Sequence, residues 1–193
     1  NGIKVVFGKD ATKIPAYLFY MSENNKSYSP KIKSVEFEEN SVCTAIGNFA
    51  FYYCTSLTEI QVPTGIKTIG NSAFYYCEAL DNIVISDEVQ SIGDSAFYLC
   101  SEISEIEIPA RVTTIGNQTF YGCSKLIIYC EVASVPTGWN SNWNPSNRPV
   151  IWDYKNNEAD SNGCIYTIVD GIKYSLKDGA ATIVRQPKTL SGK

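Results

Sequence analysis

Residues 69–91 read IGNSAFYYCEALDNIVISDEVQS, and near copies of this string precede and follow it. The Ile-Gly pair that opens the string recurs with a period of 23 residues, at Ile46, Ile69, Ile92 and Ile115. In every copy the pair leads to Ala-Phe or Thr-Phe, then to Tyr, and two residues later to Cys. A fixed period of this length indicates one small structural unit stacked on copies of itself.

Each copy combines a helix pattern with a strand pattern. An Asn or Asp follows every Ile-Gly pair, as is typical of the residue that caps a helix N-terminus. Phe74, Cys77 and Leu80 are spaced three apart, which places them on one face of a short helix. Ile83 and Ile85 then alternate with Val84, which is the period of a strand. We therefore expect one short helix and one strand in each unit.

A unit this small cannot bury its apolar residues alone, so neighbouring units must share one core. Stacked strands then form a parallel sheet, and the crossover rule predicts a right-handed coil. The predicted fold is an α/β solenoid with a parallel sheet on one face and short helices on the other. About five units fill residues 1–130. Four of them carry a Phe at the same position, and these side chains form one column: Phe51, Phe74, Phe97 and Phe120.

The string of Ile-Gly, Asn or Asp, Ala-Phe or Thr-Phe, Cys, and then Ile-x-Ile or Ile-x-Val before Pro resembles the BspA-like leucine-rich repeats, also called the Treponema pallidum type. The resemblance covers roughly residues 3–130, and residues 129–143 look like the usual end of such an array. It implies a leucine-rich-repeat coil in a large secreted or surface-anchored bacterial protein. It also implies adhesion to host proteins or to other cells, but no ligand-binding residue is carried over.

Two segments follow the array. Residues 131–157 are rich in Trp and Pro, and we interpret them as a cap and linker; an aromatic sugar-binding platform is the alternative. Residues 158–193 predict a β-meander that begins a second module, because three apolar runs are separated by the turn signals Asp170-Gly171 and Asp178-Gly179. The expected strands are 164–169, 172–176 and 180–184.

Seven Cys invite a zinc or disulfide interpretation, but the spacing argues against both for the four that recur once per unit. Stacked layers lie about 5 Å apart, so four such sulfurs form a straight ladder and cannot surround one metal ion. Their parallel Cβ vectors also disfavour disulfides. We expect buried free thiols at Cys54, Cys77, Cys100 and Cys123. The sequence assigns no role to Cys43, Cys130 and Cys164.

Composition excludes several classes of function. The chain has 16 Lys and Arg against 20 Asp and Glu, and no long basic run, which argues against nucleic-acid binding. No apolar run is long enough for a membrane span. The chain lacks His, and it has no phosphate-binding glycine loop or nucleophile motif. We therefore expect a non-catalytic module without cofactor or metal; the family resemblance implies that it lies outside the cell or on its surface.

One candidate contact surface is the outward side of the predicted sheet. Its acidic residues create a negative field that can attract a basic segment of an extracellular protein, including a host protein. The alternative is a face that is charged only for solubility. The candidate residues are Glu36, Glu38, Glu59, Gln61, Asn82, Val84, Glu105, Glu107, Tyr129 and Glu131.

A second candidate surface is a column of tyrosines beside the Phe column, which could bind a glycan or a protein. The alternative is a stack of rings that packs neighbouring units together. The sequence also leaves open a passive spacer with no ligand, or carbohydrate binding through Tyr and Trp clusters. The column consists of Tyr52, Tyr75, Tyr98 and Tyr121.

Overall fold

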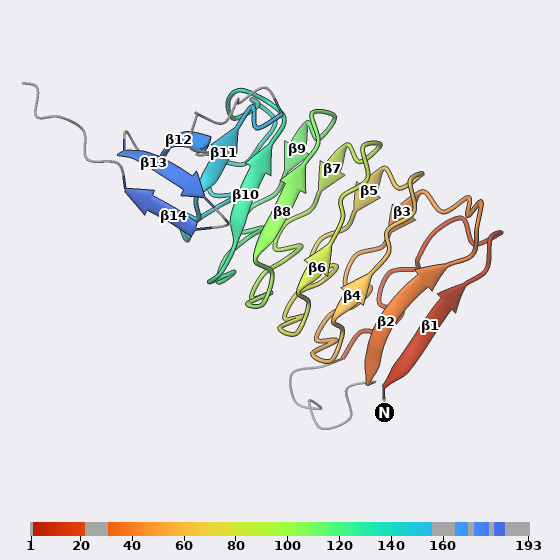
Figure 1. Ribbon diagram of the computed structural model, residues 1–193. Helices are drawn as coiled ribbons and strands as arrows, with labels where there is room; N and C mark the ends of the chain where they lie inside the picture. The colour runs from red at the N-terminus through yellow and green to blue at the C-terminus, as the bar shows by residue number, and fades with distance from the viewer. Residues whose placement is uncertain (1, 22–30, 156–164, 170–171, 178–179, 184–193) are drawn as a thin grey trace, which may run out of the picture.

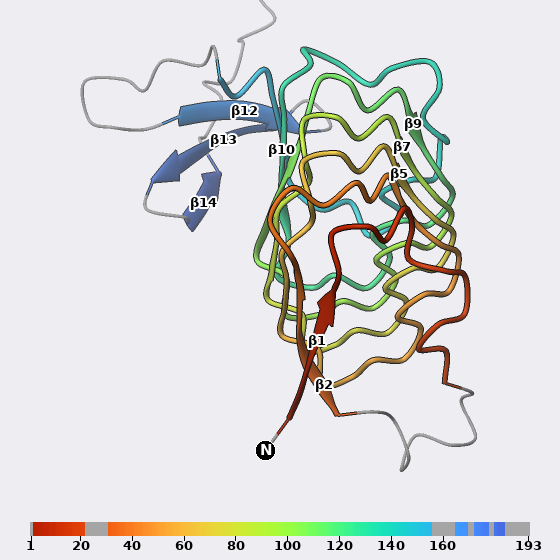
Figure 2. The ribbon, with the colours of Figure 1, turned by 90° about the vertical axis from the view of Figure 1, so that its right-hand side faces the viewer.

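The computed structural model describes residues 2–21 and 31–155 and the strands at 165–169, 172–177 and 180–183. The chain coils around one long core, with a ladder of parallel strands along one face and a second ladder along the opposite face (Figure 1). The end-on view shows the successive turns nearly superposed (Figure 2). This is the parallel solenoid that the period of the repeat predicts.

The first face is built from strands that lie one per turn. β2, β4 and β6 pair in parallel, and their register places Val35 beside Ile60 and Ile60 beside Ile83. All three side chains are buried, which confirms the strand positions expected from alternation. In chain order the strands are β1 (Ile3–Phe7), β2 (Ile32–Phe37), β4 (Glu59–Ile60), β6 (Asn82–Ile83), β8 (Glu105–Ile108), β10 (Ile127–Cys130) and β11 (Val150–Trp152).

The opposite face carries a narrower sheet, formed where each Ile-Gly pair occurs. Its strands are β3 (Ala45–Ile46), β5 (Thr68–Ile69), β7 (Ser91–Ile92) and β9 (Thr114–Ile115), in the order β3-β5-β7-β9. Isolated parallel bridges extend it at both ends, from Ile14 to Ile46 and from Ile115 to Trp139. The Ile of each pair is buried, so the two sheets enclose the core between them.

The expectation of short helices, and with it the α/β class, is wrong for the described part of the chain, which contains strands and turns but no helix. After each Ile-Gly pair, backbone N–H groups alternate between two kinds of acceptor, a carbonyl of the next turn and a carbonyl of the same segment. The N–H groups of Phe49 and Phe51 donate to the carbonyls of Asn71 and Ala73 in the next turn, at 2.9 and 2.8 Å. A helix would direct these N–H groups back along its own chain.

The intervening N–H groups close tight turns within the same segment. Ala50 donates to the carbonyl of Gly47 and Cys54 to that of Phe51, at 3.3 and 3.0 Å. A left-handed residue occupies the third position of each turn, with φ values of 56° at Phe49 and 60° at Tyr53. Successive β-turns therefore give the three-residue spacing of apolar side chains that suggested a helix.

The Phe column is confirmed as one continuous stack in a single core. The ring centroids of Phe51, Phe74, Phe97 and Phe120 lie 5.3, 5.4 and 5.7 Å apart along the stack, with planes within 6° of parallel. All four side chains are fully buried. Each turn therefore completes the interior of its neighbour, as the short unit requires.

The ladder cysteines are buried free thiols, as predicted. Each thiol donates to a backbone carbonyl of the preceding turn: Cys77 Sγ lies 3.2 Å from the oxygen of Phe51, and Cys100 Sγ lies 3.1 Å from that of Phe74. Burial raises the pKa of Cys54 and of Cys123 to about 12. These thiols are therefore unreactive packing groups at neutral pH.

The Asn and Asp residues after the Ile-Gly pairs also differ from expectation, because they do not cap their own turn. Asn48 Oδ1 accepts the N–H of Asn71 at 2.8 Å, and Asn71 Oδ1 accepts the N–H of Asp94 at 3.0 Å. Asp94 Oδ1 accepts the N–H of Asn117 at 2.6 Å. These side chains connect each turn to the next and form a hydrogen-bonded ladder along the coil.

At the C-terminal end, Trp139 and Trp143 lie over the last core layer. Trp139 Nε1 donates to the carbonyl of Val112 at 2.9 Å, and Trp143 packs edge-on against Phe120 at 5.8 Å between centroids. Both indoles are about 95% buried, with 5% and 6% exposed. β11 pairs in parallel with β10 beside them. Residues 131–155 therefore add an irregular final turn to the coil.

Beyond this turn, three strands form an antiparallel meander, which confirms the expected strands to within one residue at each end. They are β12 (Ile165–Val169), β13 (Ile172–Lys177) and β14 (Ala180–Ile183), paired in the order β12-β13-β14. Cys164 lies outside the described residues. The proposed module boundaries at 130, 131, 157 and 158 remain predictions.

Candidate protein-binding face

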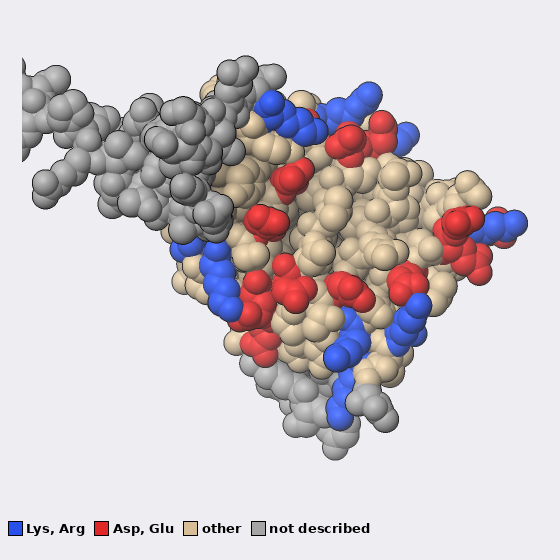
Figure 3. Space-filling model, viewed as in Figure 1, with Lys and Arg blue, Asp and Glu red and all other residues tan. Residues whose placement is uncertain are grey.

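The outward side of β2, β4, β6, β8 and β10 carries the predicted acidic residues, and we call it the acidic face. Side chains alternate along a strand, so the residues between the buried ones point to solvent. Glu59 lies in register with Asn82, and Glu107 lies in register with Tyr129. Figure 3 shows acidic side chains spread across the middle of this face among uncharged ones, with basic side chains mostly toward its margins.

At the N-terminal part of the acidic face, the predicted glutamates are already partnered. Lys4 Nζ lies 2.6 Å from Glu36 Oε2 in an ion pair between β1 and β2. Glu38 accepts the backbone N–H of Lys9 at 2.9 Å. These contacts reduce the negative charge that the two carboxylates present to a ligand.

At the C-terminal part, residues that follow β11 contact the acidic face. Tyr154 donates its hydroxyl proton to Glu107 Oε2 at 2.6 Å, and Lys155 pairs with Glu131. Glu131 also accepts the N–H of Ala110 at 2.9 Å. The Tyr154 ring packs edge-on against Tyr129, with 5.7 Å between centroids. Tyr154 and Lys155 also belong to this face, although no pattern in the sequence predicted them there.

These contacts shift the proton affinities of the groups involved. Burial and the hydrogen bond to Glu107 raise the pKa of Tyr154. Burial and the nearby carboxylates of Glu105 and Glu107 raise the pKa of Tyr129. Burial acts to raise the pKa of Glu131, but the hydrogen bonds from Lys155 and from a backbone N–H outweigh it and lower the pKa. Both tyrosines are therefore neutral, and Glu131 is ionised, at neutral pH.

A cleft of 180 Å³ opens on the acidic face between β6 and β8. The described strands of this face fall into two hydrogen-bonded sheets, β1-β2-β4-β6 and β11-β10-β8, and the cleft lies where they separate. Its lining includes Ile83, Ile85 and Ile106, whose side chains are buried in the core, and the exposed side chain of Val84. Its rim carries four carboxylates, from Asp87, Glu105, Glu107 and Glu131.

Two of the predicted glutamates remain available. Glu59 and Glu105 are exposed, and neither side chain forms an ion pair or a hydrogen bond with another residue in the described ranges. Val84 lies on the cleft lining and is 67% exposed, the largest value among the exposed bulky apolar side chains of the described residues. The free part of the acidic face thus combines unpaired negative charge with exposed apolar surface.

The predicted tyrosine column is a stack of rings that extends one turn further than expected, to Tyr20. Centroid distances along the stack are 4.9, 4.7, 4.6 and 4.6 Å, with planes within 20° of parallel. The interior members cover one another's faces and expose ring edges. The stack comprises Tyr20, Tyr52, Tyr75, Tyr98 and Tyr121.

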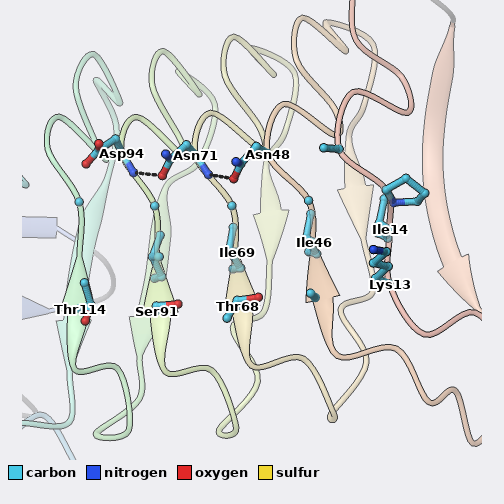
Figure 4. A pocket seen from close by; sticks show the side chains of 18 residues that line it. Lys13, Ile14, Ile46, Asn48, Thr68, Ile69, Asn71, Ser91, Asp94 and Thr114 are labelled. Atoms are coloured by element: carbon cyan, nitrogen blue, oxygen red, sulfur yellow. Dashed lines mark hydrogen bonds between the residues drawn. The ribbon is translucent and has the colours of Figure 1, made fainter.

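A longer groove of 640 Å³ follows the second sheet. This groove was not predicted from the sequence. Thr68, Ser91 and Thr114 lie along it, together with the Asn and Asp ladder (Figure 4). Its glycines permit close approach between turns, because a Cβ on Gly93 would lie 2.5 Å from the backbone nitrogen of Asn71. The Gly of every Ile-Gly pair was the available signal for this hollow.

Within the described ranges, no group of three or more Cys, Asp or Glu residues is arranged to hold a metal ion. The same ranges contain no helix that is long and apolar enough to cross a membrane.

The fold and this face define a parallel solenoid of the leucine-rich-repeat type. The BspA type leucine-rich repeat region matches residues 12–136, in six copies, and the chain therefore belongs to this family. No curated protein matches the chain.

Several solved structures resemble the chain, including the following three. A leucine-rich repeat protein from Bacteroides ovatus shares 27% identity, with a TM-score of 0.54, over 70% of this chain and 35% of its own. A leucine rich cell surface protein from Faecalibacterium prausnitzii shares 22% identity, with a TM-score of 0.60, over 97% and 55%. The pneumococcal vaccine antigen PcpA shares 19% identity, with a TM-score of 0.54, over 76% and 41%. The chain thus spans 35% to 55% of their lengths.

Proposed function

We propose that this chain is a non-catalytic protein-interaction or adhesion module of a larger secreted or cell-surface bacterial protein. Its partner is a basic segment of an extracellular protein, which binds to the acidic face. The observation that carries the proposal is the cleft between β6 and β8, which is lined by four carboxylates and by the exposed side chain of Val84. Family membership and the cell-surface relative from Faecalibacterium prausnitzii support the extracellular location.

The cleft suits a Lys or Arg side chain. Such a side chain has an apolar stem that can lie on Val84, and a cationic head that can reach the carboxylates at the rim. The chain itself already illustrates this chemistry, because Lys155 pairs with Glu131 at one side of the cleft. The exposed charge of Glu105 at the rim and that of Glu59 outside the cleft strengthen the negative field and accelerate the approach of a basic partner.

Carbohydrate binding through the tyrosine column is a weaker alternative. Sugars pack on the faces of aromatic rings, whereas the interior rings of this column are stacked on one another at 4.6 to 4.9 Å. The indoles of Trp139 and Trp143 are buried over the core and offer little surface to a sugar. A passive spacer is the remaining alternative, and it predicts no ligand at all.

The proposal is tested by selecting peptides from a random display library on the immobilised chain. We expect enrichment of extended peptides that contain Lys or Arg, with affinities that fall as salt is raised. The double variant Glu59→Lys/Glu105→Lys should weaken their binding at least tenfold. The matched control is Glu39→Lys/Glu78→Lys, which changes the net charge equally at exposed sites away from the cleft.

Two outcomes would overturn the proposal. Enriched peptides without basic residues would contradict the assigned partner chemistry. Equal loss of binding in the control variant would show that overall charge, and not the acidic face, determines binding. A chain that enriches no peptide and no glycan would fit the spacer.

A further inference from the structure

The backbone that follows β11 is tied to the turn before it. Asp153 adopts a left-handed conformation, with φ of 53°, which Asp tolerates better than most residues. Its N–H donates to the carbonyl of Val132 at 3.0 Å, and the N–H of Tyr154 donates to the carbonyl of Cys130 at 3.2 Å. These bonds fix the backbone at the edge of the acidic face, so that any movement there belongs to the side chains.

The side chains of Tyr154 and Lys155, which we call the internal pair, contact two of the four carboxylates that line the cleft. The Tyr154 hydroxyl donates to Glu107 Oε2 at 2.6 Å, and Lys155 Nζ pairs with Glu131 Oε1. Lys155 Nζ also lies 6.0 Å from the centroid of the Tyr154 ring, a distance at which a cation and an aromatic ring attract each other. The internal pair thus brings an aromatic hydroxyl and a cation to the rim of the cleft.

Most of the rim stabilises a cation at the position of Lys155. The hydrogen bond from Lys155 to Glu131 raises the pKa of the ammonium group, against an opposing effect of desolvation. The charges of Glu131, Asp87 and Glu107 raise this pKa further. Because two cations repel each other at short range, the ammonium group of a partner and that of Lys155 cannot both occupy this position.

The contact of Lys155 with Glu131 can be released by side-chain rotation alone. The Lys155 side chain is 55% exposed, and exposed ion pairs contribute little to stability. The Glu131 side chain is only 18% exposed, and it keeps a second hydrogen bond, from the N–H of Ala110 at 2.9 Å. Departure of Lys155 therefore leaves a carboxylate that is already oriented for another cation.

We propose that the internal pair is an intramolecular ligand that an external partner must displace from the cleft. The binding unit of the partner has the same chemistry, an aromatic residue followed by a lysine, and it competes with Tyr154 and Lys155 for Glu107 and Glu131. Such competition rests on the proposed function, because it controls the affinity and the specificity of the same cleft.

The experiment measures the binding of the synthetic peptide acetyl-Gly-Tyr-Lys-Gly-amide to the 193-residue chain by NMR titration. The double variant Tyr154→Phe/Lys155→Gln removes the hydroxyl and the ammonium group of the internal pair and keeps side chains of similar size. We expect it to bind the peptide about tenfold more tightly than the parent chain, because competition lowers the fraction of molecules whose cleft is open. Circular dichroism and the thermal midpoint should match those of the parent chain.

The matched control is Tyr17→Phe/Lys125→Gln. It removes the same two groups at exposed positions outside the cleft, and Lys125 is also ion-paired with a glutamate, Glu102. The control should bind the peptide with the affinity of the parent chain. A comparison peptide, acetyl-Gly-Ser-Lys-Gly-amide, keeps the lysine and lacks the aromatic ring, and it should bind more weakly to the double variant.

A second measurement follows Lys155 itself, in the NMR spectrum of the parent chain with methylated lysines. Saturating peptide should move the Lys155 signal to the position of a lysine without a carboxylate partner, and the Lys125 signal should stay in place. Equal peptide affinity of the parent chain and the double variant, an unchanged Lys155 signal at saturation, or equal binding of the two peptides would each overturn the internal-ligand proposal alone. Absence of binding to the parent chain, the double variant and the control would overturn the proposed function together with it.

Discussion

The two long faces of the solenoid differ in how strictly their residues repeat from turn to turn. Along the second sheet, four successive turns repeat Ile, Gly and then Asn or Asp, and each of these residues contacts the turn before or after it. Along the acidic face, the outward residues change from turn to turn, as with Glu59, Asn82 and Glu105 in one row. Repetition therefore marks positions that hold turns together, and variation marks positions that are free to contact a partner.

The largest expected effect is at a repeated glycine. Gly70→Ala would place a Cβ 2.6 Å from the backbone nitrogen of Asn48, and backbone at that position cannot move without disturbing the ladder. We expect a loss of about 3 kcal/mol in the free energy of unfolding, at the upper end for overpacked sites. Denaturant titration measures it. The control Gly8→Ala meets its nearest atom, Glu38 Oε2, at 3.8 Å and should change stability by less than about 0.5 kcal/mol. Equal losses of stability in the two variants would contradict the idea that Gly70 is needed for close contact between turns.

An intermediate effect is expected at the repeated cysteines. Burial raises the pKa of the Cys77 and Cys100 thiols well above the ordinary value of 9.0. A group whose pKa is higher in the folded state stabilises the fold below its unfolded pKa, and this contribution is lost as the pH rises towards the folded pKa. We therefore expect stability to fall above about pH 9, by roughly 1.4 kcal/mol per pH unit for each such thiol.

The double variant Cys77→Ala/Cys100→Ala isolates this contribution. Its free energy of unfolding should decline less steeply than that of the parent chain between pH 9 and pH 10, because two ionising groups are gone. Tyrosines and the other thiols titrate in both proteins and cancel in the comparison. Identical slopes would show that the ladder thiols do not link stability to pH.

The smallest effect on stability is expected at the varied positions. Glu59→Gln/Glu105→Gln removes two exposed carboxylates that have no ion pair or hydrogen bond within the described ranges. The free energy of unfolding should change by less than about 0.5 kcal/mol, while the affinity for basic peptides falls. Denaturant titration and binding measurements on the same preparations check this. A large loss of stability would contradict the claim that the varied positions of the acidic face contribute little to folding.

The sequence predicted the stacking correctly because a 23-residue period leaves few ways to bury Phe74 and Ile83 in every copy. It failed on the segment between them. Phe74, Cys77 and Leu80 are spaced three apart both in a short helix and in successive β-turns, so the spacing cannot separate the two. The difference depends on which carbonyl each N–H reaches, and the N–H of Phe74 donates to Ala96 in the next turn.

The acidic face was only partly predictable, for a similar reason. Strand alternation identifies Glu59 and Glu105 as outward residues without any knowledge of distant contacts. Tyr154 lies 47 positions from Glu107, beyond an irregular turn, and no local pattern connects the two. Likewise, the cleft depends on the separation of β6 from β8, which is a property of backbone pairing and not of composition.

Because the indoles cluster at one end of the coil, their fluorescence can report the local unfolding of that end. The three tryptophans of the chain, Trp139, Trp143 and Trp152, lie within 4.8 to 6.4 Å of one another by ring centroid, whereas the tyrosine stack reaches from Tyr20 to Tyr121. Indole fluorescence thus monitors the last turn, and tyrosine circular dichroism in the near ultraviolet monitors the length of the coil. If fraying begins at one end, the two signals change at different denaturant concentrations; if the coil melts as a unit, they coincide.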